Sequence, residues 1–109
     1  MPSNPLLTKL YAVMDSHAPG AGAGATVSDI TSEVCPLVAE TSLDELVEKK
    51  AGEVTVETAP IEGMEGIADG SRSWLITRPR AFGWSQSIFV ILEKDGKCNA
   101  TIRNRPFGA

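Results

Sequence analysis

The residue types best suited to recognition lie in the segment from Arg72 to Phe89. Arginine, tryptophan and phenylalanine alternate there around Pro79 and Gly83, in a connection of about nine residues between two predicted strands. Hairpin connections usually take two to five residues, and longer ones often carry function. Arginine and tryptophan are enriched in the contacts that dominate protein interfaces. They also contact phosphates and stack on bases in proteins that bind single-stranded nucleic acid.

The predicted contact surface combines this connection with the end of the last predicted strand. Its candidate residues are Trp74, Arg78, Arg80, Phe82, Trp84, Arg103 and Arg105. If the last strand lies beside the one before it, we expect both groups of arginines to share one face. A protein partner is the preferred interpretation, and a nucleic acid or another polyanion is the alternative. In a third interpretation the aromatic side chains fill the core and the arginines are only solvated.

Side chains suited to catalysis or metal binding form no recognisable set. His17 is the only histidine, and Cys35 and Cys98 are 63 positions apart. A general base or a zinc site needs several such groups that converge in space. The abundant carboxylates are explained by helix ends, by one face of a strand and by a soluble loop. We therefore expect a non-enzymatic protein with no catalytic residue, no metal and no cofactor.

The two cysteines leave two interpretations open. They are either small buried hydrophobic residues or the two ends of one long-range disulfide. A secreted domain of this size more often carries several bridges, so the low cysteine count favours a reducing compartment. The sequence predicts a cytoplasmic location on this ground. The longest apolar run, Ile88 to Leu92, is too short to span a membrane.

The formal net charge of -4 conceals an uneven distribution. Residues 1–69 carry three basic and twelve acidic side chains, whereas residues 70–109 carry seven basic and two acidic ones. We expect an acidic helical region and a basic, aromatic region on the folded molecule. The negative total argues against non-specific nucleic-acid binding, because such affinity comes mainly from the neutralisation of phosphates.

The N-terminal half is predicted to be helical. Apolar residues at helical spacing predict a helix over 5–17, and a flexible loop rich in glycine and alanine follows at 19–26. The next segment reads as helical from about Ser28, where Pro36 either begins the helix or kinks it. A capping box and favourable end charges predict another helix over 42–51.

From Glu53 onward the pattern is that of strands. Valines alternate with polar residues over 53–57, and a long loop rich in glycine follows at 59–72. Three further strands are predicted at 73–77, 87–93 and 97–104. The continuous apolar run of 87–93 predicts a strand buried on both faces. Asp95-Gly96 predicts a two-residue hairpin turn before the last strand.

These elements predict one domain over residues 1–109, because a chain of this length matches the usual domain size. The expected fold class is α+β, with N-terminal helices packed on a three- to four-stranded antiparallel sheet formed mainly by the C-terminal half. In the last strand, Cys98, Ala100 and Ile102 are expected to face the core. That strand is expected at the edge of the sheet, where it could pair with a second copy in a homodimer.

Overall fold

The computed structural model describes residues 5–18, 24–40, 43–47, 50–51, 54–58, 71–80 and 84–105, and for 50–51 it describes the backbone only. The helical elements are α1 (Pro5–Ser16), α2 (Thr31–Glu40) and the 3-10 helix η1 (Leu43–Leu46). The strands are β1 (Thr26–Asp29), β2 (Lys50–Ala51), β3 (Val54–Thr58), β4 (Arg72–Pro79), β5 (Ser85–Leu92) and β6 (Cys98–Arg105). The α+β class is confirmed.

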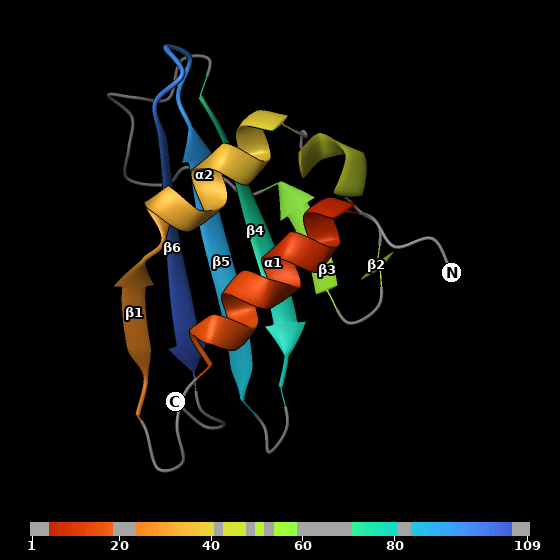
Figure 1. Cartoon of the computed structure of the whole chain (residues 1–109), viewed down its shortest axis with the longest axis vertical. Coiled ribbons are helices and arrows are strands. Elements are labelled where there is room, and N and C mark those ends of the chain that lie inside the picture. The colour runs from red at the N-terminus through yellow and green to blue at the C-terminus, as the bar shows by residue number, and fades with distance from the viewer. Residues whose placement is uncertain are drawn as a thin grey trace.

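All six strands form one antiparallel sheet in the order β1-β6-β5-β4-β3-β2. Both α-helices cross the same face of this sheet (Figure 1). The molecule therefore has two layers, one of helices and one of strands. The sheet has more strands than the three to four expected, because the short strands β1 and β2 extend it at its two edges.

The core lies between the helices and one face of the sheet. Side chains alternate between the two faces of a strand, so every second residue of β4, β5 and β6 points toward the helices. Ile88 on β5 and Ile102 on β6 are fully buried there, as are Leu10 and Met14 of α1. Truncating one of these side chains to alanine costs about 2–5 kcal/mol in a typical core. The core face predicted for the last strand is confirmed.

Helix α1 follows its prediction closely, and buried amides of the sheet hold its C-terminal end. The last carbonyl groups of a helix have no partner within the helix. The side chain of Gln86 on β5 donates to the carbonyl of Met14 at 2.8 Å, and that of Asn104 on β6 donates to the carbonyl of His17 at 2.8 Å. Because both amides are buried, they fix the end of α1 to the middle strands of the sheet.

Helix α2 starts later than predicted, because residues from Thr26 to Asp29 pair with β6 as a strand. The Asp29 carboxylate accepts a hydrogen bond of 2.8 Å from the N–H of Thr31, the first residue of α2. This bond lowers the pKa of Asp29. Pro36 lies within the helix. A disulfide joins Cys35 of α2 to Cys98 of β6, which decides between the two interpretations of the cysteines.

The helix predicted over 42–51 is wrong. Of the described residues in this range, only Leu43–Leu46 is helical, as a single 3-10 segment. Val47 then forms a parallel bridge with Val56 of β3, and Lys50–Ala51 pairs with the start of β3. Because the backbone of this segment pairs with a neighbouring strand, tertiary pairing overrides the local preference for a helix.

Strands β4 and β5 are longer than predicted, and β6 has the predicted length but starts one residue later. Three details differ. The buried face of β5 alternates with a face that is half-buried except at Ile91, so the strand is not fully covered on both sides. The hairpin before β6 has a three-residue loop, because the N–H of Glu93 donates to the carbonyl of Lys97 and Gly96 adopts a positive φ of 96°. Strand β6 lies between β1 and β5, so the expected exposed edge is wrong and the edges are β1 and β2.

The two predicted loops lie mainly outside the described residues. This is the case for 19–23 of the loop predicted at 19–26 and for 59–70 of the loop predicted at 59–72. At their described ends, Thr26 already belongs to β1 and Arg72 to β4. Within the described part of the chain, no helix is long and apolar enough to cross a membrane.

The disulfide between Cys35 and Cys98 predicts a stability that depends on the redox state. Closing a loop with a sequence separation of 63 stabilises the folded state by about 4 kcal/mol if the effect is mainly on the entropy of the unfolded chain. Urea unfolding with and without a reductant should show this loss. A double variant with Cys35→Ser and Cys98→Ser should be equally destabilised and should not respond to the reductant. Equal midpoints of the wild-type chain in both conditions would contradict the prediction.

Candidate functional site

The two faces of the sheet separate the predicted contact residues into two groups. Arg78 pairs in register with Gln86, which pairs with Asn104, and this row faces the helices. Arg103 pairs with Ser87, one residue away from that row on each strand, and therefore lies on the opposite face. The expectation that all arginines share one face is wrong, because alternation along the strands places them on different sides.

On the helix side, Asp15 holds two of the predicted arginines. Its Oδ1 accepts hydrogen bonds from Nη1 of Arg78 at 2.8 Å and from Nη1 of Arg80 at 2.9 Å. The Arg78 guanidinium also lies over the ring of Tyr11, 4.4 Å from its centroid, and its side chain is 14% exposed. The hydrogen bond from Arg80, followed by that from Arg78, lowers the pKa of Asp15. Both arginines thus attach β4 and the residue after it to α1.

Trp74 fills the core beneath η1. It is 1% exposed, and its indole Nε1 donates to Oδ1 of Asp44 at 3.0 Å. Arg72 forms an ion pair with the same carboxylate, and its guanidinium lies 5.1 Å from the centroid of the Trp74 ring. These contacts favour the interpretation of Trp74 as a core residue that anchors η1 to β4.

The connection between β4 and β5 is only partly described. Phe82 lies outside the described residues. Trp84 is half-buried, and its carbonyl accepts a hydrogen bond of 2.7 Å from the N–H of Arg80. This bond continues the ladder between the two strands by one step. A role of Phe82 and Trp84 in contacting a partner stays a prediction.

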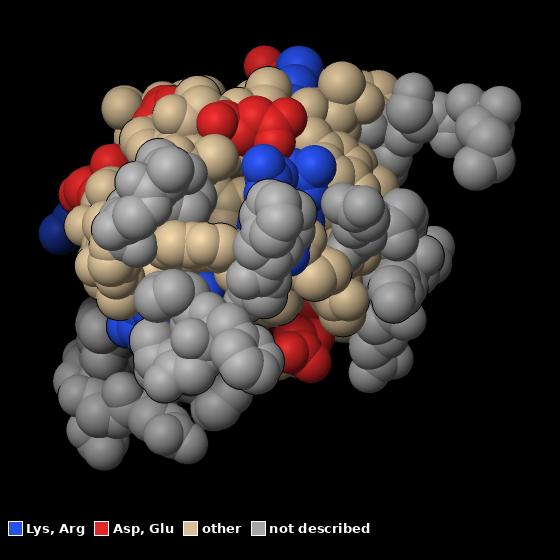
Figure 2. Space-filling model, turned by 90° about the horizontal axis from the view of Figure 1, so that it is seen from below, with Lys and Arg blue, Asp and Glu red and all other residues tan. Residues whose placement is uncertain are grey.

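In the part of the chain that the structure describes, basic side chains of the C-terminal half pair with acidic side chains of the N-terminal half. Arg72, Arg78 and Arg80 of the basic part pair with Asp44 and Asp15 of the acidic part. Acidic and basic side chains accordingly lie next to one another in the view from below (Figure 2). Among the described residues, opposite charges therefore meet where the helices pack on the sheet, which differs from the expected separation into an acidic helical region and a basic aromatic region.

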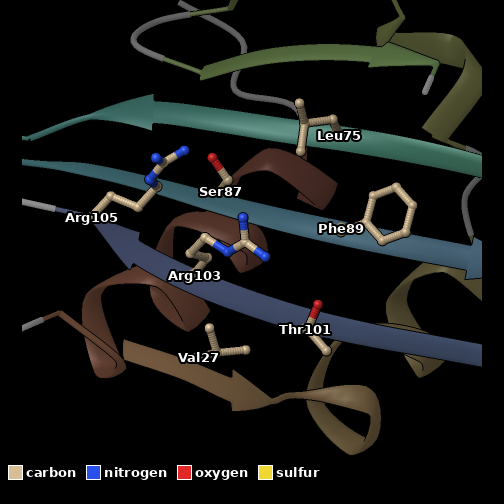
Figure 3. Close-up of a pocket in the computed structure, with 7 residues that line it drawn as sticks. All are labelled: Val27, Leu75, Ser87, Phe89, Thr101, Arg103 and Arg105. Carbon is tan, nitrogen blue, oxygen red and sulfur yellow. The ribbon is translucent and has the colours of Figure 1, made fainter. Parts of the chain in front are cut away.

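The face of the sheet that the helices leave uncovered carries a hollow of about 330 Å³. It is lined from strands β1, β4, β5 and β6. The lining residues are Val27, Leu75, Ser87, Phe89, Thr101, Arg103 and Arg105. Figure 3 shows the two arginines and Ser87 toward one end of the hollow and the ring of Phe89 toward the other, with the helices behind the sheet.

Apolar side chains and cationic groups meet in this hollow. Val27 is 64% exposed and is the one exposed large hydrophobic side chain among the residues that the structure describes. Its partner in register is Arg103 of β6. Arg103 is exposed, and no carboxylate of the described residues pairs with it. Such a surface can cover apolar side chains and can pair with a carboxylate or another anionic group.

Sequence reasoning identified Arg103 and Arg105 but missed the apolar part of the hollow. The pattern that could have revealed it is the apolar run of 87–93, which places Ile88 and Val90 on one face and Phe89 and Ile91 on the other. The helices cover the face of Ile88 and Val90, whereas on the other face Phe89 is half-buried and only Ile91 of these two is buried. The sequence-based prediction of a strand buried on both faces misses this difference.

The single histidine and the two cysteines have partners within the fold. Nε2 of His17 lies 2.7 Å from Oε2 of Glu33, which links the end of α1 to α2. The two cysteines form the disulfide. Within the described ranges, no group of three or more histidine, cysteine or acidic side chains could hold a metal ion. That the protein is not an enzyme stays a prediction.

Comparisons with protein-family models, with curated proteins and with solved structures found no match to this chain. The chemistry of the uncovered face is therefore the feature of the molecule that bears on its function.

The contacts of Asp15 predict a pH-dependent contribution to stability. Because its carboxyl has a pKa below the ordinary value near 3.8, the stabilisation is present above that pH and is lost as the pH falls through the lowered value. Asp15→Asn should lower the free energy of unfolding by at most about 1 kcal/mol near neutral pH, since the side chain is 58% exposed and salt screens it.

The measurement is urea unfolding at neutral and at acidic pH, with Glu40→Gln as the control. Glu40 pairs with Lys9 at 3.9 Å on the surface and has one cationic partner instead of two. The control should change stability by less than Asp15→Asn at neutral pH. A loss for Asp15→Asn that stays the same at pH values far below 3.8 would contradict the prediction.

Proposed function

We propose that this protein is a small non-enzymatic binding module, acting as an adaptor, inhibitor or modulator, and that it binds an acidic segment of a protein partner. The binding surface is the uncovered face of the sheet. The observation that supports this most directly is that the exposed Val27 lies beside Arg103 in a hollow that Leu75 and Phe89 also line. Large exposed apolar side chains next to cationic ones are typical of interaction surfaces.

The two kinds of side chain contribute differently to binding. Covering the exposed part of Val27 contributes about 1 kcal/mol, and the half-buried Leu75 and Phe89 add to this as their remaining surface leaves water. Arg103 and Arg105 contribute orientation and selection for negative charge. A segment that carries both apolar and acidic residues complements this surface, whereas a basic segment is repelled.

This proposal moves the binding surface away from the connection between β4 and β5. Of the seven residues predicted from the sequence, Arg103 and Arg105 line the hollow. Trp74, Arg78 and Arg80 attach the helices to the sheet and are less suited to a partner. Binding to nucleic acid remains the second candidate, because two arginines and a phenylalanine on an open sheet face suit stacked bases and phosphates. The net charge of -4 disfavours it.

The disulfide bears on the compartment in which the protein acts. The cytoplasmic location expected from the sequence depends on the low cysteine count, because a secreted domain of this size more often carries several bridges. The Cys35–Cys98 bond weakens that argument, because both cysteines are paired. Disulfides of this structural kind persist in oxidising compartments. We therefore propose an oxidising compartment as the place of action, and intact pairing in protein isolated from its natural host would test this.

Charge reversal on the uncovered face tests the proposed function. The probe is a fluorescent octapeptide of alternating glutamate and valine, titrated with the full chain and followed by anisotropy. The double variant with Arg103→Glu and Arg105→Glu should weaken binding at least tenfold, because two attractive contacts become repulsive. Lys94→Glu, in the exposed hairpin loop away from the hollow, is the matched control and should change affinity less than threefold.

Two further probes decide between binding to an acidic protein segment and binding to nucleic acid. An alternating lysine–valine octapeptide should bind at least tenfold more weakly than the glutamate–valine peptide. A single-stranded oligothymidine should bind no better than the lysine–valine peptide. Tight oligothymidine binding that falls steeply with salt and is lost in the double variant would favour nucleic acid instead. No binding of any probe would refute the proposed function.

A further inference from the structure

We propose that the partner segment binds as an added β-strand along the free edge of β1, with every second side chain directed into the hollow. This inference depends on the proposed function, because the hollow supplies the side-chain contacts. It adds the backbone contacts, and it defines the partner as an extended segment with acidic residues at alternate positions. Strand addition to a sheet edge is a general mode of peptide recognition.

The backbone of β1 has one side that no strand of the described residues occupies. Strand β1 is the first in the sheet and pairs only with β6. Just after β1, the N–H of Ile30 donates to the carbonyl of Ala100 at 2.9 Å. Backbone groups alternate in direction along an antiparallel strand. The N–H and C=O groups of Thr26 and Ser28 therefore point toward β6, and those of Val27 and Asp29 point away from the sheet.

This edge lacks the usual protection against strand pairing. Natural sheets protect their edges with lysines, prolines, bulges or very short strands. The segment Thr26–Asp29 contains no lysine and no proline, and its register with β6 continues without a bulge. Its one charged group, the Asp29 carboxylate, is turned to the N–H of Thr31. The opposite edge, β2, has only two residues, so β1 is the edge that can accept a strand.

The free edge and the hollow adjoin one another. Val27 belongs to both, because its backbone points outward along the edge while its side chain lines the hollow. Residues paired across two strands place their side chains on the same face of a sheet. An added residue opposite Val27 therefore directs its side chain over the hollow. Arg103 lies two strands away from that position, about 10 Å, which the combined lengths of an arginine and a glutamate side chain span.

Backbone hydrogen bonds along β1 and side-chain contacts in the hollow are both needed to bind the segment. Two outward-facing residues offer at most four backbone hydrogen bonds, and each is weak in net terms because it replaces a hydrogen bond to water. This alone does not hold a strand, because ordering each residue of the segment costs about as much. The hollow adds the coverage of Val27 and the charge contacts of Arg103 and Arg105. Backbone pairing thus sets the direction of the segment, and the arginines select its sequence.

Hydrogen exchange of the full chain tests the inference directly. The glutamate–valine octapeptide is added to isotope-labelled protein, and amide exchange is followed by NMR. Exchange of the Val27 and Asp29 amides should slow at least tenfold, because strand addition gives these hydrogens an acceptor. The amides of Thr26 and Ser28 already face β6, so they serve as internal controls and should change less than threefold.

Backbone methylation of the probe provides a second readout that does not depend on any protein variant. In an extended peptide all glutamate N–H groups point to one side and all valine N–H groups to the other. Methylation of one of these two sets should therefore abolish binding, and methylation of the other should change affinity less than threefold. Val27→Pro, which removes an outward N–H, should weaken binding at least tenfold, whereas Val27→Ala keeps the N–H and should weaken it about threefold.

The outcomes separate this inference from the proposed function. Peptide binding could depend on Arg103 and Arg105 yet leave the Val27 and Asp29 amides unprotected and tolerate methylation of either set. That result would overturn strand addition, but it would leave binding to the uncovered face intact. No binding of the octapeptide overturns both. Protection of Val27 without any probe, together with a doubled mass by light scattering, assigns the edge to a second copy of the chain and overturns the peptide proposal.

Discussion

Two helices cover one face of the six-stranded sheet, and the roles of the residues in β4, β5 and β6 follow from this one-sided coverage. Side chains alternate along each strand, so neighbouring residues of similar chemistry have opposite surroundings. Ile88 is part of the core, whereas Phe89 lies on the uncovered face. Arg78 is held by α1, whereas Arg103 is open to solvent. A second helical layer would have converted the whole uncovered face into core.

Charge pairing orients the helices on this sheet more than it stabilises them. Exposed ion pairs are each worth about 0–1 kcal/mol, which is small beside the burial of the apolar side chains of α1. Asp15 of α1 and Asp44 of η1 nevertheless bind arginines of β4 through directional, charge-assisted contacts. The uneven charge along the sequence is therefore explained mainly by contacts within the fold. Arg103 lies on the opposite face of β6, away from these contacts with the helices.

The elements that could be predicted from the sequence are those whose causes are local. Helix α1 and the alternation in β6 follow from the spacing of apolar residues within each segment. Strand β1 could not be recognised, because Thr26–Asp29 has no pattern of its own and is a strand only through β6, far along the chain. The helix predicted over 42–51 failed for the same reason, since its end pairs with β3. Which face each arginine occupies depends on the register between strands, which no single segment contains.

The pairing of β1 with β6 also constrains how the chain reaches its structure in a cell. Thr26 and Arg103 belong to neighbouring strands, and Cys35 bonds to Cys98. Strand β1 and helix α2 therefore cannot complete their native contacts until β6 is present. On a ribosome or at a translocation pore, helices α1 and α2 emerge long before their sheet. Their apolar faces and the unpaired Cys35 thiol then stay accessible to chaperones and to thiol oxidoreductases until β6 arrives. Only the completed polypeptide can close the sheet and protect both.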